Sequence, residues 1–460
     1  MNKNRITILN IGSTVVLQGL AFFSDPLFSR LLGTNNYGIA SVYLTWVQIS
    51  SIVFSLQAAG TFSVARVYFP SEDQKRYQSS VLGLSTLSYL GFSLLAILGV
   101  FIASRWIKIN FAMIIWGLIH GWGLYCVSAI NSKFTYEFSA GKNFLLSVLT
   151  SAITIIMSLI LINAYPLDTN YWGRIIGQSA VYGCIGIVLF VCMLRVGKTF
   201  YNKEYWKFTL PIAIPTIFHL LAHIILNQSD KLMIQNIISN SAAGIYALAH
   251  TFSAVLSTLY QALNNSWVPF YYEYNKQNQL EKIKAHSKNY IELFTILTMG
   301  FILVAKEVFQ IYAKASFWEG TDLIPLFAIG SYFIFLYSFP VNYEFYNKKT
   351  KSIAMGTSLA SACNIVLNII FILLWGIKGA VIATIVAHGL QFAFHYICAR
   401  RIDQGNFTYR ISDFLPGLLA VCLTCAMYFF TKDLWIIRWI FALILGIFIL
   451  LRIVKRKEIF

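Results

Sequence analysis

The chain has 460 residues, of which 58% are hydrophobic and only 12% are charged, and its formal net charge is +17. A soluble globular domain is about one quarter charged, so this composition excludes a soluble protein and indicates an integral membrane protein. The apolar residues form long runs, about the 20 residues that an α-helix needs to cross the bilayer, and not the short alternating segments of an outer-membrane barrel. The basic charge is therefore assigned to cytoplasmic loops, and nucleic acid is not expected as a partner.

Fourteen apolar runs are predicted to be membrane-spanning helices. The first follows a basic N-terminus but lacks a small-x-small cleavage site, so it is expected to be a retained helix and not a signal peptide. In chain order the predicted spans are 7–29, 38–62, 81–103, 109–130, 144–165, 172–194, 208–234, 242–266, 289–312, 322–343, 353–375, 379–399, 411–430 and 434–451.

The lysine and arginine residues test this number of spans. With the N-terminus in the cytoplasm, 25 of the 35 Lys and Arg residues fall in cytoplasmic loops, which leaves 10 for the other side. This bias predicts an even number of spans, with both termini cytoplasmic. The longest loop, residues 271–290, is predicted to be a helical connector, and no loop is long enough for a soluble catalytic domain.

A weak internal repeat appears at an offset of 206 residues. The offset places Gly38-Ile39 on Gly244-Ile245, Gly173 on Gly379 and Gly183 on Gly389. Because it equals six spans, the repeat predicts two pseudo-symmetric lobes related by an axis along the membrane normal. The predicted parts are an N-terminal lobe at 1–203, a C-terminal lobe at 204–402 and a helix pair at 403–460.

The chain contains no strong cofactor motif. Gly197-Lys198-Thr199 resembles the end of a P-loop, but Cys192 occupies the position of its first glycine, so ATP-driven transport by this chain is not expected. Cys422 and Cys425 form a CxxC on an apolar helix without further ligands, which favours packing over zinc or redox chemistry. All seven cysteines fall in apolar runs, and neither a disulfide framework nor a cofactor is predicted.

Polar residues on span 208–234 lie at helical spacing. His219, His223, Asn227 and Asp230 are separated by 4, 4 and 3 residues, which places them on one helix face, and Lys231 follows directly. Such a face inside hydrocarbon must contact protein or a water-filled cavity. We expect it to belong to a substrate or ion pathway.

The first span carries a similar acid. Asp25 precedes Pro26, which is expected to kink the helix, and the repeat places Asp25 one position from Asp230. A carboxylate is costly in the membrane, so both acids are predicted to bind a proton or a cation in a cavity. The alternative is a structural ion pair, for example Asp25 with Arg30 or Asp230 with Lys231.

Other polar residues extend this prediction, with hydrogen bonding between helices as the alternative. On span 242–266 His250, Gln261 and Asn264 share one face with two serines. Three isolated histidines are instead expected to pack in the interior: His120, His388 and His395.

Three cations lie near span ends. Arg30 and Lys231 are on the predicted outer side, where the positive-inside rule does not require them, so they are candidates for contacts with phosphate. Arg66 is included in the pathway, although a snorkelling charge at the cytoplasmic end is the simpler interpretation for it.

Three segments resemble the Wzx-type polysaccharide repeat-unit flippases, whose superfamily also contains the MATE exporters and the lipid II flippase. They are "PLFSRLLGTNNYGIASVY", "SDKLMIQNIISNSAAGIYALA" and "SACNIVLNIIFILLWGIKGAVIATIVAHG", in that order along the chain. The resemblance covers essentially the whole chain. Arg30 matches the arginine of the family's "SRxLG" motif, and Asp25 matches the first-helix acid of MATE-type transporters.

The resemblance implies a two-lobed MATE-like bundle around a central cavity that opens alternately to either side of the bacterial inner membrane. The implied cargo is an undecaprenyl-pyrophosphate-linked oligosaccharide, and a gradient of H⁺ or Na⁺, or the membrane potential, would drive its movement. Membrane lipids and other polysaccharide-assembly membrane proteins are the further partners implied. Spans 411–430 and 434–451 resemble the pair that holds the lipid tail in the lipid II flippase. The first two spans lack that flippase's several inward arginines, which favours a capsule or O-antigen unit over lipid II.

Three other functions would each require different sequence features. A MATE-like H⁺- or Na⁺-coupled drug exporter predicts an acidic, aromatic cavity and usually twelve spans. A membrane-embedded polymerase or acyltransferase requires a long outer loop with Arg or His clusters, whereas the predicted outer loops are short. A purely structural scaffold does not require polar faces on three spans. The sequence therefore favours a flippase, with the exporter as the alternative.

Overall fold

The computed structural model describes residues 3–104, 110–137, 139–403 and 407–456, and the side chains of these except residues 3–18, 21 and 452–456. Its described part contains thirteen α-helices and two short 3₁₀ helices, and no strand. Ten helices are long and apolar enough to cross a membrane, and the apolar part of α13 is shorter. The predicted all-helical, multi-spanning class is therefore confirmed, while the number of fourteen spans and the cytoplasmic termini stay predictions.

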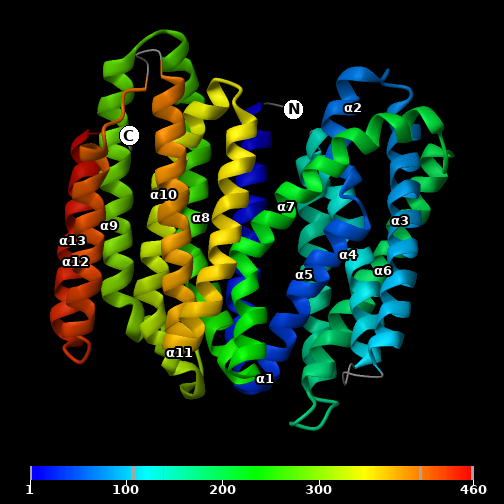
Figure 1. Ribbon diagram of the computed structural model, residues 1–460, viewed down its shortest axis with the longest axis horizontal. Helices are drawn as coiled ribbons and strands as arrows, with labels where there is room; N and C mark the ends of the chain where they lie inside the picture. Colours follow the sequence, from blue (N-terminus) through cyan, green and yellow to red (C-terminus); the bar gives the residue numbers. More distant parts are fainter. Residues whose placement is uncertain (1–2, 105–109, 138, 404–406, 457–460) are drawn as a thin grey trace. The chain divides into compact units, whose positions relative to one another are not determined.

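The chain divides into two compact units, and each forms a bundle of helices (Figure 1). Unit 1 covers Met1–Leu232 and unit 2 covers Met233–Phe460. The predicted boundaries at 203/204 and 402/403 stay predictions. Unit 1 contains α1 Lys3–Phe54, the 3₁₀ helix η1 Ala58–Thr61, α2 Phe62–Tyr68, α3 Gln74–Ala103, α4 Phe111–Tyr136, α5 Ala140–Ile162, α6 Tyr171–Gly197 and most of α7 Lys203–Ile237. Unit 2 contains α8 Asn240–Lys276, α9 Leu280–Tyr312, the 3₁₀ helix η2 Ala315–Leu323, α10 Ile324–Tyr346, α11 Thr350–Ile402, α12 Ile411–Phe430 and α13 Trp435–Arg456.

Two helices are longer than a bilayer requires, and each contains one glycine with non-helical backbone angles. A straight helix of 52 residues, the length of α1, would extend about 78 Å, more than twice the hydrocarbon thickness of roughly 30 Å. Gly33 interrupts α1 at φ 67°, and Gly376 interrupts α11 at φ 60°. Each helix therefore consists of two segments, which agrees with the two spans predicted in each region.

Two boundaries differ from those predicted. The second span was expected to extend to residue 62, but α1 ends at Phe54 because Leu56 and Gln57 adopt positive φ angles, which an α-helix does not accommodate. The 271–290 connector is not one helix. It consists of the last turns of α8 and the first turns of α9, separated by residues 277–279.

One glycine pair of the repeat, Gly173 and Gly379, lies at close backbone contacts, whereas at Gly389, the repeat mate of Gly183, the nearest atom to a Cβ would be 3.6 Å away. A Cβ at Gly173 would come within 2.4 Å of the Ile162 backbone, and a Cβ at Gly379 within 1.9 Å of the Phe371 carbonyl oxygen. In both cases the contact is with the end of the preceding helical segment. The two positions related by the 206-residue offset thus have the same packing role, which supports the repeat.

Candidate functional site

Asp25 lies in α1 and is 8% exposed. The helix continues through Pro26, and the Ser29 hydroxyl donates a hydrogen bond to the Pro26 carbonyl at 2.9 Å. Asp25 is eight residues before the Gly33 interruption, near one end of the first segment of α1, and its burial shows that it points into the bundle. A carboxylate at such a position requires a partner of opposite charge or a polar cavity.

The partner of Asp25 is Arg174 of α6. The Arg174 Nη2 donates to the Asp25 Oδ1 at 3.4 Å, and both side chains are nearly buried. The guanidinium also lies over the rings of Phe28, at 4.3 Å, and Tyr37, at 5.0 Å. The Tyr37 hydroxyl donates a further hydrogen bond to Asp25.

Lys231 adds a second positive charge to this group. It is 9% exposed, donates a hydrogen bond to Gln228 Oε1 at 2.7 Å, and interacts electrostatically with Asp25 and with its neighbour Asp230. Asp230 is 2% exposed. Both residues belong to the part of α7 that is included in unit 1. We refer to Asp25, Arg174, Asp230 and Lys231 as the Asp25 charge cluster; its formal charges sum to zero.

A cavity of about 330 Å³ lies beside this cluster, inside unit 1. Its walls come from α1, α4, α5 and α6, and they combine charged, amide and hydroxyl groups with aromatic rings. Among the lining residues are Asp25, Gln48, His120, Thr154, Arg174 and Gln178. The volume is several times the 30 Å³ that one water occupies in the liquid. The cavity can therefore hold a hydrated cation or a small polar group next to the Asp25 carboxylate.

His120 packs as the sequence predicts for an isolated histidine. Its ring stacks on Tyr182 at 4.7 Å between centroids, and its Nδ1 lies 3.5 Å from the Tyr43 hydroxyl. Tyr43 is in turn held by Ser179 at 2.6 Å. The histidine thus forms part of the cavity wall and is fixed in place by neighbouring rings.

The predicted polar face of α7 has two parts. His219 and His223 are exposed and Asn227 is half-buried; the Asn227 amide donates to the His223 backbone carbonyl at 2.8 Å. Asp230 and Lys231, one turn further on, are buried. The exposed imidazoles and the buried residues of the Asp25 charge cluster thus lie at opposite ends of one helix face, which is the face that the spacing predicts. The role of this face in transport stays a prediction.

The residues selected on α8 belong to unit 2. His250 is half-buried and lies against the rings of Tyr246 and Phe327, with centroids 6.3 and 5.3 Å away. Asn264 accepts a hydrogen bond from the Asn342 amide at 3.0 Å, while Gln261 is exposed. The Asn264 contact joins α8 to α10, which is the interhelical hydrogen bond offered as the alternative.

Arg30 and Arg66 do not join the Asp25 charge cluster as buried groups. Both side chains are exposed, Arg30 three residues before the Gly33 interruption and Arg66 in the last turn of α2. Their proposed contact with substrate stays a prediction.

The sequence reasoning missed two buried charge partners. Arg174 falls inside the predicted span 172–194, two residues from its start, where the positive-inside rule does not require a cation. That signal could have selected it. Glu344 and His395 form the second missed pair: His395 Nδ1 lies 3.1 Å from Glu344 Oε1, and neither side chain is exposed. The sequence predicts only packing for His395, since no spacing rule connects it with Glu344, 51 positions away.

Comparison with known proteins places this arrangement in a family. A family model described as "Polysaccharide biosynthesis protein" matches residues 5–275, more than half of the chain and all of the Asp25 charge cluster. The chain belongs to this family, that of the Wzx-type flippases. It is a multi-pass protein of the bacterial inner membrane, and its family and fold are those of transporters.

Two curated relatives of this flippase come from Haemophilus influenzae. One, "Lsg locus putative protein 1", is 24% identical over 368 residues, which is 76% of this chain and 85% of the relative. The other, "Uncharacterized membrane protein", is 23% identical over 386 residues, which is 80% of this chain and 87% of the relative. Both alignments extend over most of the two chains compared.

Solved structures confirm the MATE-like fold of the flippase. "Lipid II flippase MurJ, inward closed conformation" has a TM-score of 0.72 at 18% identity and covers 98% of this chain and 100% of its own. An inward-facing multidrug resistance MATE family transporter of the MOP superfamily has a TM-score of 0.58 at 12% identity, covering 84% of this chain and 96% of its own. The predicted MATE-like fold is therefore confirmed, and at these identities the likeness concerns the fold alone.

Proposed function

We propose that this flippase moves undecaprenyl-pyrophosphate-linked oligosaccharide repeat units from the cytoplasmic to the outer leaflet, for the synthesis of O-antigen, capsule or another exopolysaccharide. Alternating access of two lobes, 1–203 and 204–402, exposes the sugar and pyrophosphate to each side in turn. The helix pair at 403–460 accompanies the second lobe. The observation that carries the proposal is a buried, mixed-charge cluster beside a polar cavity in a chain of the polysaccharide biosynthesis family.

The Asp25 charge cluster supplies the coupling in this proposal. Its central hydrogen bond is long, at 3.4 Å between Arg174 and Asp25, and the Lys231 charge is close enough to act on the same carboxylate. When Asp25 binds H⁺ or Na⁺ from the cavity, its attraction for the two cations is lost. Arg174 and Lys231 can then interact with pyrophosphate, arginine through its planar fork and lysine as a point charge.

The other predicted residues extend the pathway. The exposed His219, His223 and Asn227 lead along α7 toward the cluster, and Arg30 is an exposed cation near the same end of α1. Arg66 on α2, and His250, Gln261 and Asn264 on α8, complete the set that we assign to the substrate or ion path.

Deletion of the gene followed by analysis of lipid-linked sugars tests the function. Complete repeat units should accumulate on the cytoplasmic leaflet, and reintroduced wild-type protein should restore surface polysaccharide. Asp25→Asn and Arg30→Ala should abolish that restoration at unchanged protein abundance. Asp168→Asn, an exposed acid outside the helices, is the matched control and should behave as wild type. Restoration by both pathway variants would contradict the site assignment.

A MATE-like exporter coupled to H⁺ or Na⁺ is the second candidate. A buried acid beside a cavity lined by aromatic rings favours it, whereas the two buried cations oppose the binding of a cationic drug. Sensitivity of the deletion strain to organic cations, without accumulation of lipid-linked sugars, would establish the exporter instead.

A further inference from the structure

A second cavity of unit 1, with a volume of about 420 Å³, lies between α4, α5 and α6. None of the described residues that line it carries a charge, and none of them belongs to the predicted site. Most have hydroxyl or amide side chains, among them Ser128, Asn131, Ser132, Ser147, Thr150 and Ser151. We call it the neutral cavity, and we call the cavity beside the Asp25 charge cluster the Asp25 cavity.

The neutral cavity adjoins the Asp25 cavity. Leu124, Ser151 and Tyr182 line both of them, so these three residues mark the junction. The Tyr182 ring is held at the junction by the His120 ring stacked on it, 4.7 Å away between centroids. The two cavities therefore follow one another along the same helices, and Asp25 lines the inner one.

The neutral cavity reaches the end of α4. Its lining extends from Leu124 to Tyr136, the last residue of the helix, a distance of 12 residues or about 18 Å. Thr135 and Tyr136 at that end are exposed. With the Asp25 cavity, whose lining of α4 begins at His120, the lined length is about 24 Å, most of the roughly 30 Å of bilayer hydrocarbon. The bias of basic residues predicts that the α4–α5 end is cytoplasmic.

The order of residues on α5 separates a lipid face from a hydroxyl face. The exposed apolar side chains of this helix include Leu145, Leu149, Ile153, Ile156 and Ile160. Two residues advance a helix by about 200°, so Ser147 and Ser151 lie opposite Leu149 and toward the cavities. The hydroxyls of α5 are thus turned away from lipid and into the interior of unit 1.

Three polar atoms that line the two cavities have no hydrogen-bond partner among the described residues: Asn131 Oδ1, Thr150 Oγ1 and Thr154 Oγ1. Thr150 is 2% exposed and Thr154 is 7% exposed. A buried threonine of a helix can return its hydroxyl to the carbonyl four residues earlier, as Thr298 does to Phe294 at 2.8 Å. The two threonines of α5 do not, and a buried polar atom without a partner is unfavourable. Water in the cavities is the partner that these atoms require.

The chemistry of the lining favours a cation over an anion. Asn131 Oδ1 only accepts hydrogen bonds, and hydroxyl oxygens also accept them from the water shell of a cation. No described residue that lines the neutral cavity is basic, so an anion would meet no positive charge there. The inner cavity contains the Asp25 carboxylate, to which the proposed function assigns the coupling ion.

We propose that unit 1 contains its own water-filled passage for the coupling cation, which leads from the α4–α5 end through the neutral cavity to Asp25. The cation is small and hydrated, either H⁺ carried by water or Na⁺, and its water shell contacts Thr150, Ser151 and Thr154. Under the predicted topology the passage joins Asp25 to the cytoplasm, so the ion does not share the route of the sugar. The inference rests on the proposed role of Asp25 in coupling.

Cysteine labelling of the full chain tests whether water fills the passage. In a chain whose seven native cysteines are replaced by alanine, Ser128→Cys and Ser151→Cys should react in inside-out membrane vesicles with a trimethylammonium methanethiosulfonate. Relative to the rates with a free thiol in solution, the anionic sulfonate analogue should react more slowly. Leu149→Cys, on the lipid face of α5, is the matched control and should not react.

The proposal is overturned if Ser128→Cys and Ser151→Cys react no faster than the Leu149→Cys control, or if the anionic reagent is the faster one. The labelling requires no transport. If the deletion strain accumulates no lipid-linked sugars, the proposed function fails, and the labelling still decides whether the passage exists.

Removal of the unpartnered hydroxyls tests whether the ion uses the passage. Thr150→Val and Thr154→Val keep the shape of the side chains and break no hydrogen bond among the described residues, so the thermal midpoint should not fall. The double variant should slow the appearance of surface polysaccharide at least about fivefold, the equivalent of one hydrogen bond to the passing ion. Thr298→Val, which removes a buried hydroxyl of unit 2, is the matched control and should transport as wild type.

Normal transport by the double variant would overturn the proposal. A lowered thermal midpoint would also overturn it, because the hydroxyls would then serve folding. The same rates measured with Na⁺ replaced by choline at constant pH distinguish the two cations: wild-type transport persists if the cation is H⁺ and is lost if it is Na⁺.

Discussion

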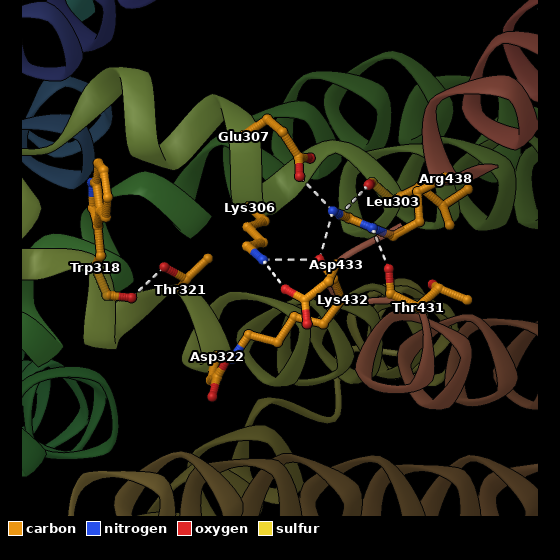
Figure 2. Close-up of polar contacts among 10 residues, drawn as sticks. All are labelled: Leu303, Lys306, Glu307, Trp318, Thr321, Asp322, Thr431, Lys432, Asp433 and Arg438. Carbon is orange, nitrogen blue, oxygen red and sulfur yellow. Dashed lines mark hydrogen bonds and ion pairs between the residues drawn. The ribbon is translucent and has the colours of Figure 1, made fainter. Parts of the chain in front are cut away.

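The two units each contain a buried arginine among charged partners, but the two arginines are held in opposite ways. Arg174 of unit 1 donates to Asp25 at 3.4 Å, is also hydrogen-bonded to Tyr37, and lies over aromatic rings, while its Nε and Nη1 have no hydrogen-bond partner among the described residues. Arg438 of unit 2 has no exposed surface and uses all three of its nitrogens (Figure 2). Its Nε donates to the Thr431 carbonyl at 3.2 Å and its Nη1 to the Leu303 carbonyl at 2.9 Å.

The partners of Arg438 form an ion-pair network that joins α9 to the α12–α13 turn (Figure 2). Arg438 pairs with Glu307, which also accepts from the Trp439 indole at 3.2 Å. Lys306 pairs with Asp433 at 2.9 Å. Lys432 pairs with Asp322 of η2 at 2.5 Å. Because each buried donor has an acceptor, removal of one member leaves others unsatisfied, so this network stabilises the fold.

The comparison separates two uses of buried charge in one membrane protein. A fully bonded arginine holds one conformation, whereas an arginine that leaves two of its nitrogens unbonded beside a cavity can exchange its partner at lower cost. We therefore interpret Arg438 as structural and propose a role in transport for Arg174. Four predictions follow this difference, in decreasing order of expected effect.

The largest effect is expected for Arg438→Ala. The substitution leaves Glu307 and the carbonyls of Leu303 and Thr431 without their donor, and breaking a buried pair in this way costs about 3–5 kcal/mol. Thermal unfolding in detergent should shift to a clearly lower temperature, and membrane abundance should fall. Arg400→Ala is the control, since that half-exposed arginine pairs with Asp403 at 3.7 Å and should cost less than about 1 kcal/mol. Normal stability with lost transport in Arg438→Ala would reverse our interpretation of the network.

The paired substitution Asp25→Asn with Arg174→Gln should act on transport and not on folding. It removes one negative and one positive charge together, so no unpaired buried charge results. We expect normal abundance and at least about tenfold less surface polysaccharide, equivalent to 1.4 kcal/mol in the transport barrier. Arg195→Gln, an exposed arginine near the end of the same helix, is the control. A double variant that transports normally would show that the Asp25 charge cluster is structural.

Alanine substitutions at the glycines that interrupt α1 and α11 should lower the thermal stability by a smaller amount, similar in both units. Gly33 and Gly376 have φ angles of 67° and 60° with ψ angles of 177° and −141°, a region that is essentially restricted to glycine, so a Cβ there costs about 1–3 kcal/mol. Gly33→Ala and Gly376→Ala should each lower the thermal midpoint by a few degrees. Gly91→Ala, in the middle of α3 with no atom near its Cβ, should leave the midpoint unchanged or raise it. Equal midpoints for all three variants would show that the backbone at these glycines relaxes without strain.

The smallest effect concerns pH. Asp433 lies in the turn between α12 and α13, where the hydrogen bond from Lys306 and the charge of that ammonium hold the pKa of the carboxyl below its ordinary value of 3.8. A depressed pKa in the folded state means that the ionised group contributes stability above the ordinary pKa. The contribution is lost as the pH falls from that value through the lowered one.

Thermal midpoints measured from neutral pH to about pH 3 check this. The acid-induced loss of stability should be slightly smaller for Asp433→Asn than for wild type, because the variant has no carboxyl to protonate. Asp168→Asn, a substitution of another exposed acid, is the control. If the thermal midpoint of Asp433→Asn falls with pH as much as that of wild type, the Lys306–Asp433 ion pair does not contribute to stability.

The sequence by itself determined the class of this protein, because hydrophobic runs and the bias of basic loops are local properties that one chain displays directly. It also located the polar face of α7, since a spacing of 4, 4 and 3 places residues on one side of any helix. It also singled out Asp25 and Asp230 as costly acids, and both are buried, while their binding of a proton or a cation stays a prediction. The repeat also pairs Gly173 with Gly379 in the sequence, and both glycines lie at close backbone contacts.

Only the tertiary structure decided the partners. Arg174 lies 149 positions from Asp25 and Glu307 lies 131 positions from Arg438, and no spacing rule connects residues on helices so far apart in the chain. A helix pattern shows which side chains share a face, but the packing of helices decides which faces meet. For this reason the sequence proposed Arg30 and Lys231 as partners from proximity along the chain, and the fold placed Arg174 against Asp25. The difference between a saturated and an unsaturated arginine, on which the assignment of function depends, exists only in three dimensions.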